Sequence, residues 1–250
     1  MPVTTKYPEP GVAVITVDEP PVNALPVRGW FDIAHEVTAA GQDTACHVVV
    51  LRAEGRGFNA GVDIKEIQRD SGYDKLVGAN RGCAAAFSAV YDCPVPVIAA
   101  VRGFCLGGGI GLVGNADVVV AADDATFGLP EVDRGALGAA THLARLVPQH
   151  LMRALYYTAS TIDAHQLHHH GSVYQVVPPD RLDEAALALA HRIAAKDTRV
   201  IRAAKHAING IDPQQVHRSY RYEQGFTFEL NLTGASDEAR RRFVDEGKGA

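Results

Sequence analysis

Cysteine is scarce in this chain, and its spacing excludes two common uses. There are four cysteines in 250 residues, with neither a Cys-x-x-Cys pair nor the spacing of zinc ligands. Residues 1–5 lack the basic region followed by an apolar one that opens a secretory signal. We therefore expect free thiols and a cytoplasmic protein, with no disulfide framework.

Long apolar runs and an excess of charge of one sign are also missing. Proline, arginine or aspartate interrupts each apolar segment before it reaches the roughly 20 residues of a membrane span. The 24 basic and 29 acidic side chains give a net charge of −5. This balance provides no electrostatic basis for binding nucleic acid. We expect neither a membrane nor a nucleic acid as a partner.

The patterns that are present indicate an α/β protein. Short β-branched runs at 12–17, 47–51, 95–101 and 118–122 alternate with helical patterns after Pro26 and at 80–90. From residue 149 onward helical periodicity dominates, at 149–159, 163–169, 180–196 and 198–209, with one further strand pattern at 173–177. We divide the chain into an α/β core, residues 1–190, and a helical C-terminal region, residues 191–250.

Two glycine-rich turns, residues 57–63 and 103–109, each follow a buried strand pattern. If such a turn opens a helix, the first N–H groups of that helix have no intrahelical acceptor. Two of these groups aimed at one point would form an oxyanion hole. Either turn could also serve only as a turn. Neither carries the Gly-Lys-Ser/Thr ending of a phosphate-binding loop, and a dinucleotide-binding fingerprint is weak here.

Four motifs in register give the chain a family resemblance. Residues 21–25 (PVNAL), 57–64 (GFNAGVDI), 103–109 (GFCLGGG) and 125–131 (ATFGLPE) resemble the crotonase (enoyl-CoA hydratase/isomerase) superfamily. The resemblance implies a crotonase-like fold of repeated ββα units with a helical C-terminal trimerisation region. It also implies an acyl-CoA substrate, a homotrimer or homohexamer, and no cofactor beyond the coenzyme A of the substrate.

The resemblance assigns roles to particular residues. Val62 and Gly108 stand where the family has the two N–H donors of its oxyanion hole, which would stabilise a thioester enolate. The residues expected at coenzyme A are Asn23, Arg28, Ala60 and Gly61. Arg28 and Lys248 are candidate contacts of its phosphates.

The departures from the family pattern bear on the reaction. Hydratases with two catalytic glutamates have one of them two residues after the glycine triplet, where this chain has Gly111. The other is present as Glu131, the expected catalytic residue. Adding water across a double bond needs hydroxide and a proton delivered to neighbouring carbons, whereas one carboxylate shuttles one proton. The pattern therefore favours hydrolysis or isomerisation, although a water-assisted hydratase is still open. We also expect the missing side chain at 111 to leave room for a bulky ring.

Residues 127–155 and 220–230 resemble an actinobacterial branch linked to breakdown of the last two steroid rings, as in cholesterol degradation. This resemblance implies a ring-opening enzyme that cleaves a carbon–carbon bond of a bicyclic β-keto acyl-CoA by a retro-Claisen reaction. Two alternatives remain. One is an enoyl-CoA hydratase or isomerase of fatty-acid β-oxidation, and the other is a non-catalytic member that binds acyl-CoA.

Several other polar residues are secondary candidates. His142, Arg134 and Asp163 could assist Glu131, but a lone helical histidine and a residue suited to a helix N-cap are usually structural. Asp63 is expected to cap the helix that follows it. Residues 168–170 are three histidines, yet consecutive helical side chains point in different directions, so we expect no metal site.

Overall fold

The main sheet has six strands, seen in a computed structural model that describes residues 2–69 and 72–246. Their order across the sheet is β1 (Val3–Glu9), β2 (Val12–Val17), β3 (Val48–Ala53), β4 (Val97–Val101), β6 (Val118–Ala122) and β9 (Gln175–Val177). β1 pairs with β2 in the antiparallel sense, and every other pairing is parallel.

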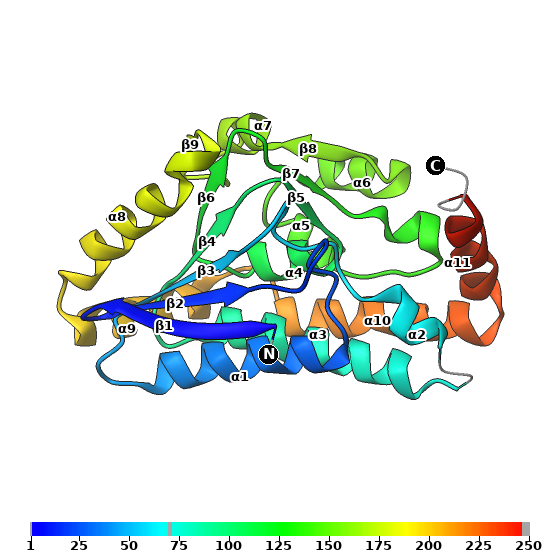
Figure 1. Cartoon of the computed structure of the whole chain (residues 1–250), viewed down its shortest axis with the longest axis horizontal. Coiled ribbons are helices and arrows are strands. Elements are labelled where there is room, and N and C mark those ends of the chain that lie inside the picture. Colours follow the sequence, from blue (N-terminus) through cyan, green and yellow to red (C-terminus); the bar gives the residue numbers. More distant parts are fainter. Residues whose placement is uncertain (1, 70–71, 247–250) are drawn as a thin grey trace.

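Helices cover both faces of this sheet, which explains the almost continuous apolar strands. In β3, Val49 and Leu51 belong to the larger core, shared with α1 (Val27–Gln42) and α3 (Asp74–Asp92). Val48 and Val50 face the opposite way and pack with α8 (Leu182–Ala194). Figure 1 shows α1 and α3 running together along one side of the sheet and α8 along the other.

A second, three-stranded sheet includes part of the second glycine-rich turn. It consists of β5 (Phe104–Leu106), β7 (Thr126–Gly128) and β8 (Thr161–Asp163). β4 and β5 precede α4 (Gly108–Val113), and β6 and β7 precede the 3-10 helix η1 (Pro130–Arg134). The predicted α/β fold of repeated ββα units is thereby confirmed.

The remaining helices are short connections or belong to the C-terminal half. They are α2 (Ile64–Gln68), α5 (Ala140–Leu143), α6 (Gln149–Thr158), α7 (Ala164–His169), η2 (Pro179–Arg181), α9 (Thr198–Ile211), α10 (Val216–Leu232) and α11 (Ala235–Glu246). α10 is tied to α3, because Gln224 Nε2 donates to the Asn80 carbonyl at 2.8 Å. None of the described helices is both long and apolar enough to cross a membrane.

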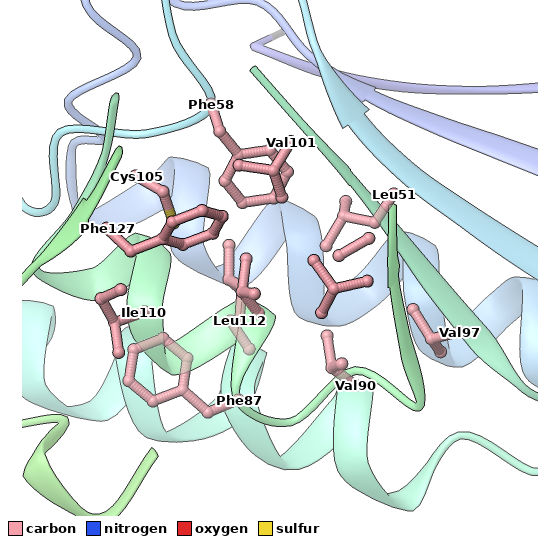
Figure 2. Packing of buried hydrophobic residues seen from close by; sticks show 14 of the residues in the cluster. Leu51, Phe58, Phe87, Val90, Val97, Val101, Cys105, Ile110, Leu112 and Phe127 are labelled. Carbon is pink, nitrogen blue, oxygen red and sulfur yellow. The ribbon is translucent and has the colours of Figure 1, made fainter. Parts of the chain in front are cut away.

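Large side chains from several elements fill the core between the sheet and the helices. Figure 2 shows Phe87 of α3 beside Ile110 of α4, with Leu112 and Phe127 nearby. The side chains of these four residues are almost completely buried. All four cysteines are free and buried.

Most strand patterns match the structure, but some elements were not anticipated. The patterns at 12–17 and 118–122 coincide with β2 and β6, whereas α3 begins at Asp74, six residues before the predicted start at 80. β1, the small sheet and α10 have no distinct pattern among those described above. The predicted boundary at residue 190 falls inside α8, which packs on the main sheet; the division into two regions stays a prediction.

Candidate active site

The two glycine-rich turns lie against each other. Backbone hydrogen bonds join them, from Leu106 N to Asn59 O at 2.8 Å and from Phe58 N to Phe104 O at 2.9 Å. Gly61 and Gly107 both have positive φ, of 88° and 58°. A Cβ atom at position 61 would lie 3.4 Å from Gly108 N. Glycine permits this close approach of two backbone segments because it has no side chain.

Val62 and Gly108 line the same cavity, of about 130 Å³. Gly108 is the first residue of α4, so its N–H has no intrahelical acceptor. The bonds next to Val62 run from Leu25 N to Gly61 O and from Asp63 N to Leu25 O, and the Val62 N–H takes no part in them. Within the described residues, neither N–H has a hydrogen-bond acceptor. Both are available to a ligand oxygen in the cavity.

The side chain of Trp30 makes glycine necessary at position 108. A Cβ atom there would lie 2.4 Å from Trp30 Cη2, which is far below contact distance. Trp30 is fully buried and makes an edge-to-face contact with Phe87. The aromatic core therefore holds the Gly108 backbone against the cavity.

Two buried asparagines brace the first turn from behind. Asn23 Nδ2 donates to the carbonyls of Glu54 at 2.8 Å and Gly57 at 2.9 Å. Asn59 Nδ2 donates to the Asn23 carbonyl, and Asn59 Oδ1 accepts from Gly61 N at 2.8 Å. Asn23, predicted at coenzyme A, is thus placed by the structure behind the turn and outside the residues that line the cavity.

The other residues predicted at coenzyme A are divided between the cavity and the surface. Ala60 and Gly61 line the cavity. Arg28 lies outside it at the start of α1, with a side chain 76% exposed and Nε 3.7 Å from Asp32 Oδ2. Lys248 lies outside the described residues.

Glu131 lies on η1, with its carboxyl group against the second glycine turn. A Cβ atom at position 107 would be 2.6 Å from Glu131 Oε1 and 3.5 Å from the Gly61 Cα atom. Glu131 Oε2 is buried without a hydrogen-bond partner among the described residues. The structure thus brings one carboxyl group and the two N–H groups to the same part of the cavity.

Burial raises the pKa of Glu131 to about 8, because a charged carboxylate is poorly solvated there. Arg134, three residues along in η1, also lines the cavity, and its charge pulls the Glu131 pKa down. Burial in turn lowers the pKa of the Arg134 guanidinium, and the Glu131 charge opposes that shift. A carboxyl group with a pKa near neutrality is suited to exchanging protons with a substrate.

His142 and Asp163, the other secondary candidates, lie outside the cavity lining. The His142 ring is buried against Phe87 and Tyr220, each with its ring centre 5.0 Å away, and burial lowers its pKa to about 3. Asp163 is the N-cap of α7, where its side chain accepts from Gln166 N at 2.8 Å. Asp63 caps α2 by accepting from Lys65 N at 2.9 Å, as predicted.

The expectation of free space at position 111 was wrong. A Cβ atom on Gly111 would lie 2.1 Å from Phe87 Cζ, inside the aromatic ring. Phe87 is 2% exposed and is packed between Trp30 and Tyr220. An aromatic ring therefore occupies the direction in which a side chain at 111 would point, and it excludes a second carboxylate there.

Sequence reasoning missed several residues of the cavity lining because they come from distant helices. These are chiefly Phe87 and Cys83 of α3, Tyr220 of α10 and Arg240 of α11. Burial raises the pKa of both the Cys83 thiol and the Tyr220 hydroxyl, so each keeps its proton. A larger hollow of about 840 Å³ lies between α5, α6 and α10, but neither glycine turn nor Glu131 lines it.

The fold and site define a class of protein. The family described as "Enoyl-CoA hydratase/isomerase" matches residues 8–249, and the chain belongs to it. A solved enoyl-CoA hydratase/isomerase from Xanthobacter autotrophicus Py2 superimposes with a TM-score of 0.87 at 28% identity, covering 99% of this chain and 93% of that one.

Two relatives are much more similar in sequence. A protein of Rhodococcus jostii is 68% identical over 248 residues, which cover 99% of this chain and 96% of the relative. One of Mycobacterium tuberculosis is 69% identical over 244 residues, covering 98% and 99%. Both relatives are named (7aS)-7a-methyl-1,5-dioxo-2,3,5,6,7,7a-hexahydro-1H-indene-carboxyl-CoA hydrolase.

Proposed function

We propose that this chain hydrolyses a ring carbon–carbon bond of a bicyclic β-keto acyl-CoA in steroid ring degradation, as the names of its two relatives suggest. The observation that carries the proposal is the presence of one carboxyl group, Glu131, beside two N–H groups without acceptors. Phe87 fills the direction from which a second carboxylate would reach the substrate. One proton-transfer group and one oxyanion site match the needs of a retro-Claisen cleavage.

The reaction begins with water. The Glu131 carboxylate takes a proton from a water molecule as the water oxygen bonds to the carbon of the ring ketone. The bond between this carbon and the α-carbon of the thioester then breaks, and its electron pair forms the thioester enolate. Glu131 returns the proton to the α-carbon. The net change is addition of one water, which yields a carboxylic acid and an intact thioester.

The N–H groups of Val62 and Gly108 would hold the enolate oxygen. Charge reaches this oxygen only as the carbon–carbon bond breaks, so the two donors stabilise the transition state more than the bound substrate. Each donor contributes about 3 kcal/mol in comparable acyl-transfer sites. Both lie on backbone that the aromatic core and the asparagine network hold in place.

Replacing the carboxyl group tests this proposal directly. Wild-type protein should convert the bicyclic β-keto thioester to a product heavier by one water, measured by mass spectrometry. Glu131→Gln should abolish this turnover and still bind the CoA ester. Asp133→Asn is the matched control, because Asp133 is exposed on the same 3-10 helix, and it should act like wild type. Unchanged turnover by Glu131→Gln would refute the proposal.

A comparison of substrates with wild-type protein distinguishes the alternative functions. Rapid hydration or isomerisation of crotonyl-CoA, with the bicyclic thioester untouched, would favour a hydratase or isomerase of β-oxidation. Binding of CoA esters without turnover of any would favour a non-catalytic member of the family.

A homotrimer or homohexamer is our proposal for the assembly. Apolar residues of α9 form an exposed stripe at helical spacing, with Val200, Ile208 and Ile211 exposed by 63%, 60% and 80%. A stripe of this kind suits a contact with another copy of the chain. Light scattering after gel filtration should give three or six times the 26.7 kDa mass, and Ile208→Asp should lower it. A wild-type monomer would contradict the proposal.

The CoA moiety and the compartment belong to the same proposal. The side chain of Arg28 is 76% exposed, so its guanidinium is accessible to a phosphate of coenzyme A. A cytoplasmic location agrees with the four free, buried cysteines.

A further inference from the structure

Two guanidinium groups line a cavity that is otherwise mostly apolar. Besides Glu131, the charged side chains in the described lining are Arg134 and Arg240. Arg134 belongs to η1, the element that carries Glu131. Arg240 comes from α11 and is hydrogen-bonded to Asn231 of α10, so it belongs to the part of the lining that the C-terminal helices form.

Arg240 is held in position by side chains of its own region. Its Nη2 donates to Asn231 Oδ1 at 2.9 Å and to Asp237 Oδ1 at 2.5 Å. The Arg240 side chain is 11% exposed, and Asn231 is buried. Both contacts use one nitrogen, so Nη1 and Nε are donors without an acceptor among the described residues. A guanidinium so fixed loses little entropy when it binds a further acceptor.

Helix α11 is packed firmly against the element that carries Glu131. The Ser236 hydroxyl donates to the Gly135 carbonyl, and Ser236 is fully buried. Gly135 has φ of 63°, and a Cβ atom there would lie 2.6 Å from Ser236 Cα. Figure 1 shows α11 at the end of the molecule away from α8. The position of Arg240 is thus linked to that of η1.

We propose that Arg240 is a specificity-determining residue that binds an oxygen acceptor at the end of the acyl group remote from the thioester. The proposal rests on the proposed function, because the ring substrate would present a ketone oxygen there. The Val62 and Gly108 N–H groups are committed to the thioester oxygen. A second polar end of the acyl group needs a second donor, and an unpaired buried acceptor would weaken binding.

Two CoA esters of nearly the same shape test this role. One is cyclohexanecarbonyl-CoA, and the other is 4-oxocyclohexanecarbonyl-CoA, which adds one ketone oxygen opposite the thioester. Neither is a β-keto ester, so wild-type protein can be titrated with both by calorimetry without retro-Claisen cleavage. We expect wild type to bind the oxo ester at least about tenfold more tightly, as for a hydrogen bond from a charged donor.

Arg240→Met should remove this preference and leave the affinity for the hydrocarbon ester within about twofold. Arg240→Lys keeps the charge without the fork of donors and should retain part of the preference. The control is Arg241→Ala, since Arg241 is exposed on the same helix and should behave as wild type. An equal loss of affinity for both esters in Arg240→Met would show that Arg240 has only a structural role and would overturn the proposal.

The wild-type titration decides the matter even if Arg240→Met fails to fold. Wild type that binds the two esters equally well would also overturn the proposal. The result is separable from the proposed function, because these titrations need no turnover. A preference that depends on Arg240, found together with a Glu131→Gln variant that still cleaves the bicyclic thioester, would retain this role and refute the proposed reaction.

Discussion

The two glycine turns and the helices η1 and α11 border the same cavity, yet they contribute to it in different ways. The turns contribute backbone N–H groups at Val62 and Gly108, whose positions depend on the absence of side chains. The two helices contribute the side chains of Glu131, Arg134 and Arg240. The turns suit any acyl-CoA that forms an enolate. In the reaction that we propose, the side chains from η1 and α11 move the proton and select the acyl group, so we assign the choice of reaction to that side.

Disturbing the turns should have the largest effect. Gly108→Ala places a Cβ atom 2.4 Å from Trp30 Cη2, so the backbone must move. The N–H of residue 108 would then no longer point toward the enolate oxygen. We expect kcat to fall about 10² to 10³-fold, as when one oxyanion donor is lost. Steady-state kinetics measures this. Gly225→Ala is the control, because a Cβ atom at Gly225 meets nothing within 4 Å. A Gly108→Ala enzyme with normal kcat would remove the oxyanion role from this turn.

The ionisation of Glu131 should determine how kcat/KM depends on pH. Because burial raises the pKa of Glu131 to about 8, about one carboxyl group in ten is ionised at pH 7. If the carboxylate is the base, kcat/KM should rise about tenfold per pH unit below pH 8 and level off above it. The profile from pH 5.5 to 9.5 tests this. A flat profile across pH 7 to 9 would contradict the assignment.

The same carboxyl group should make folding less favourable as the pH rises. Between the ordinary pKa of 4.5 and the folded value of about 8, the folded protein retains a proton that the unfolded chain has released. Stability therefore falls with rising pH over this window. Glu131→Gln lacks this titration, so its unfolding free energy should exceed that of wild type by an amount that increases with pH and reaches about 3 kcal/mol at pH 7.

Urea unfolding at pH 5 and pH 7 measures this difference, with Asp133→Asn as the exposed control on the same helix. A Glu131→Gln variant less stable than wild type at pH 7, or equally stabilised at both pH values, would show that Glu131 is not a buried neutral acid.

The contact between α4 and the aromatic core should have a smaller effect. Gly111→Ala drives a methyl group into Phe87 and should cost about 1–3 kcal/mol of unfolding free energy. In a Phe87→Ala background the same change should cost almost nothing, because the ring is gone. A double-mutant cycle by denaturant unfolding gives the coupling, and Gly225→Ala, in open space on α10, is the control. Additive effects would mean that Phe87 does not exclude a side chain at 111.

The smallest effect is expected at Asp163, which lies outside the cavity. Asp163→Ala removes the α7 cap and should lower the unfolding free energy by about 1 kcal/mol, with kcat unchanged. Asp163→Asn should retain most of the stability. Thermal unfolding and steady-state rates check both variants, and a large loss of kcat in each would restore Asp163 as a catalytic candidate.

How far the sequence predicts this molecule differs between the two sides of the cavity. The turns are local features, so glycine spacing and the strands before them suggested backbone N–H donors, and the family resemblance assigned these to Val62 and Gly108, which line one cavity. The motif likewise pointed to Glu131. Its pKa could not be foreseen, because it depends on burial by segments far along the chain.

The errors come from contacts between distant segments. Phe87 lies 24 residues before Gly111, and nothing in either local pattern states that the ring fills the space beside that glycine. Arg240 lies on α11, which packs through Ser236 on Gly135, about a hundred residues earlier in the chain. Asn23 matched a family motif, yet its side-chain amide forms hydrogen bonds to backbone groups of the neighbouring loops. Tertiary packing decided each of these cases.

The most direct test of the central claim is a turnover experiment in H₂¹⁸O with the bicyclic β-keto thioester. Mass spectrometry and carbon NMR of the product locate the label. If Glu131 activates water for ring cleavage, the product should have an opened ring, an intact CoA thioester and one ¹⁸O in its new carboxylate group. An intact ring with ¹⁸O in a new hydroxyl group, or labelled acid with free coenzyme A, would contradict it.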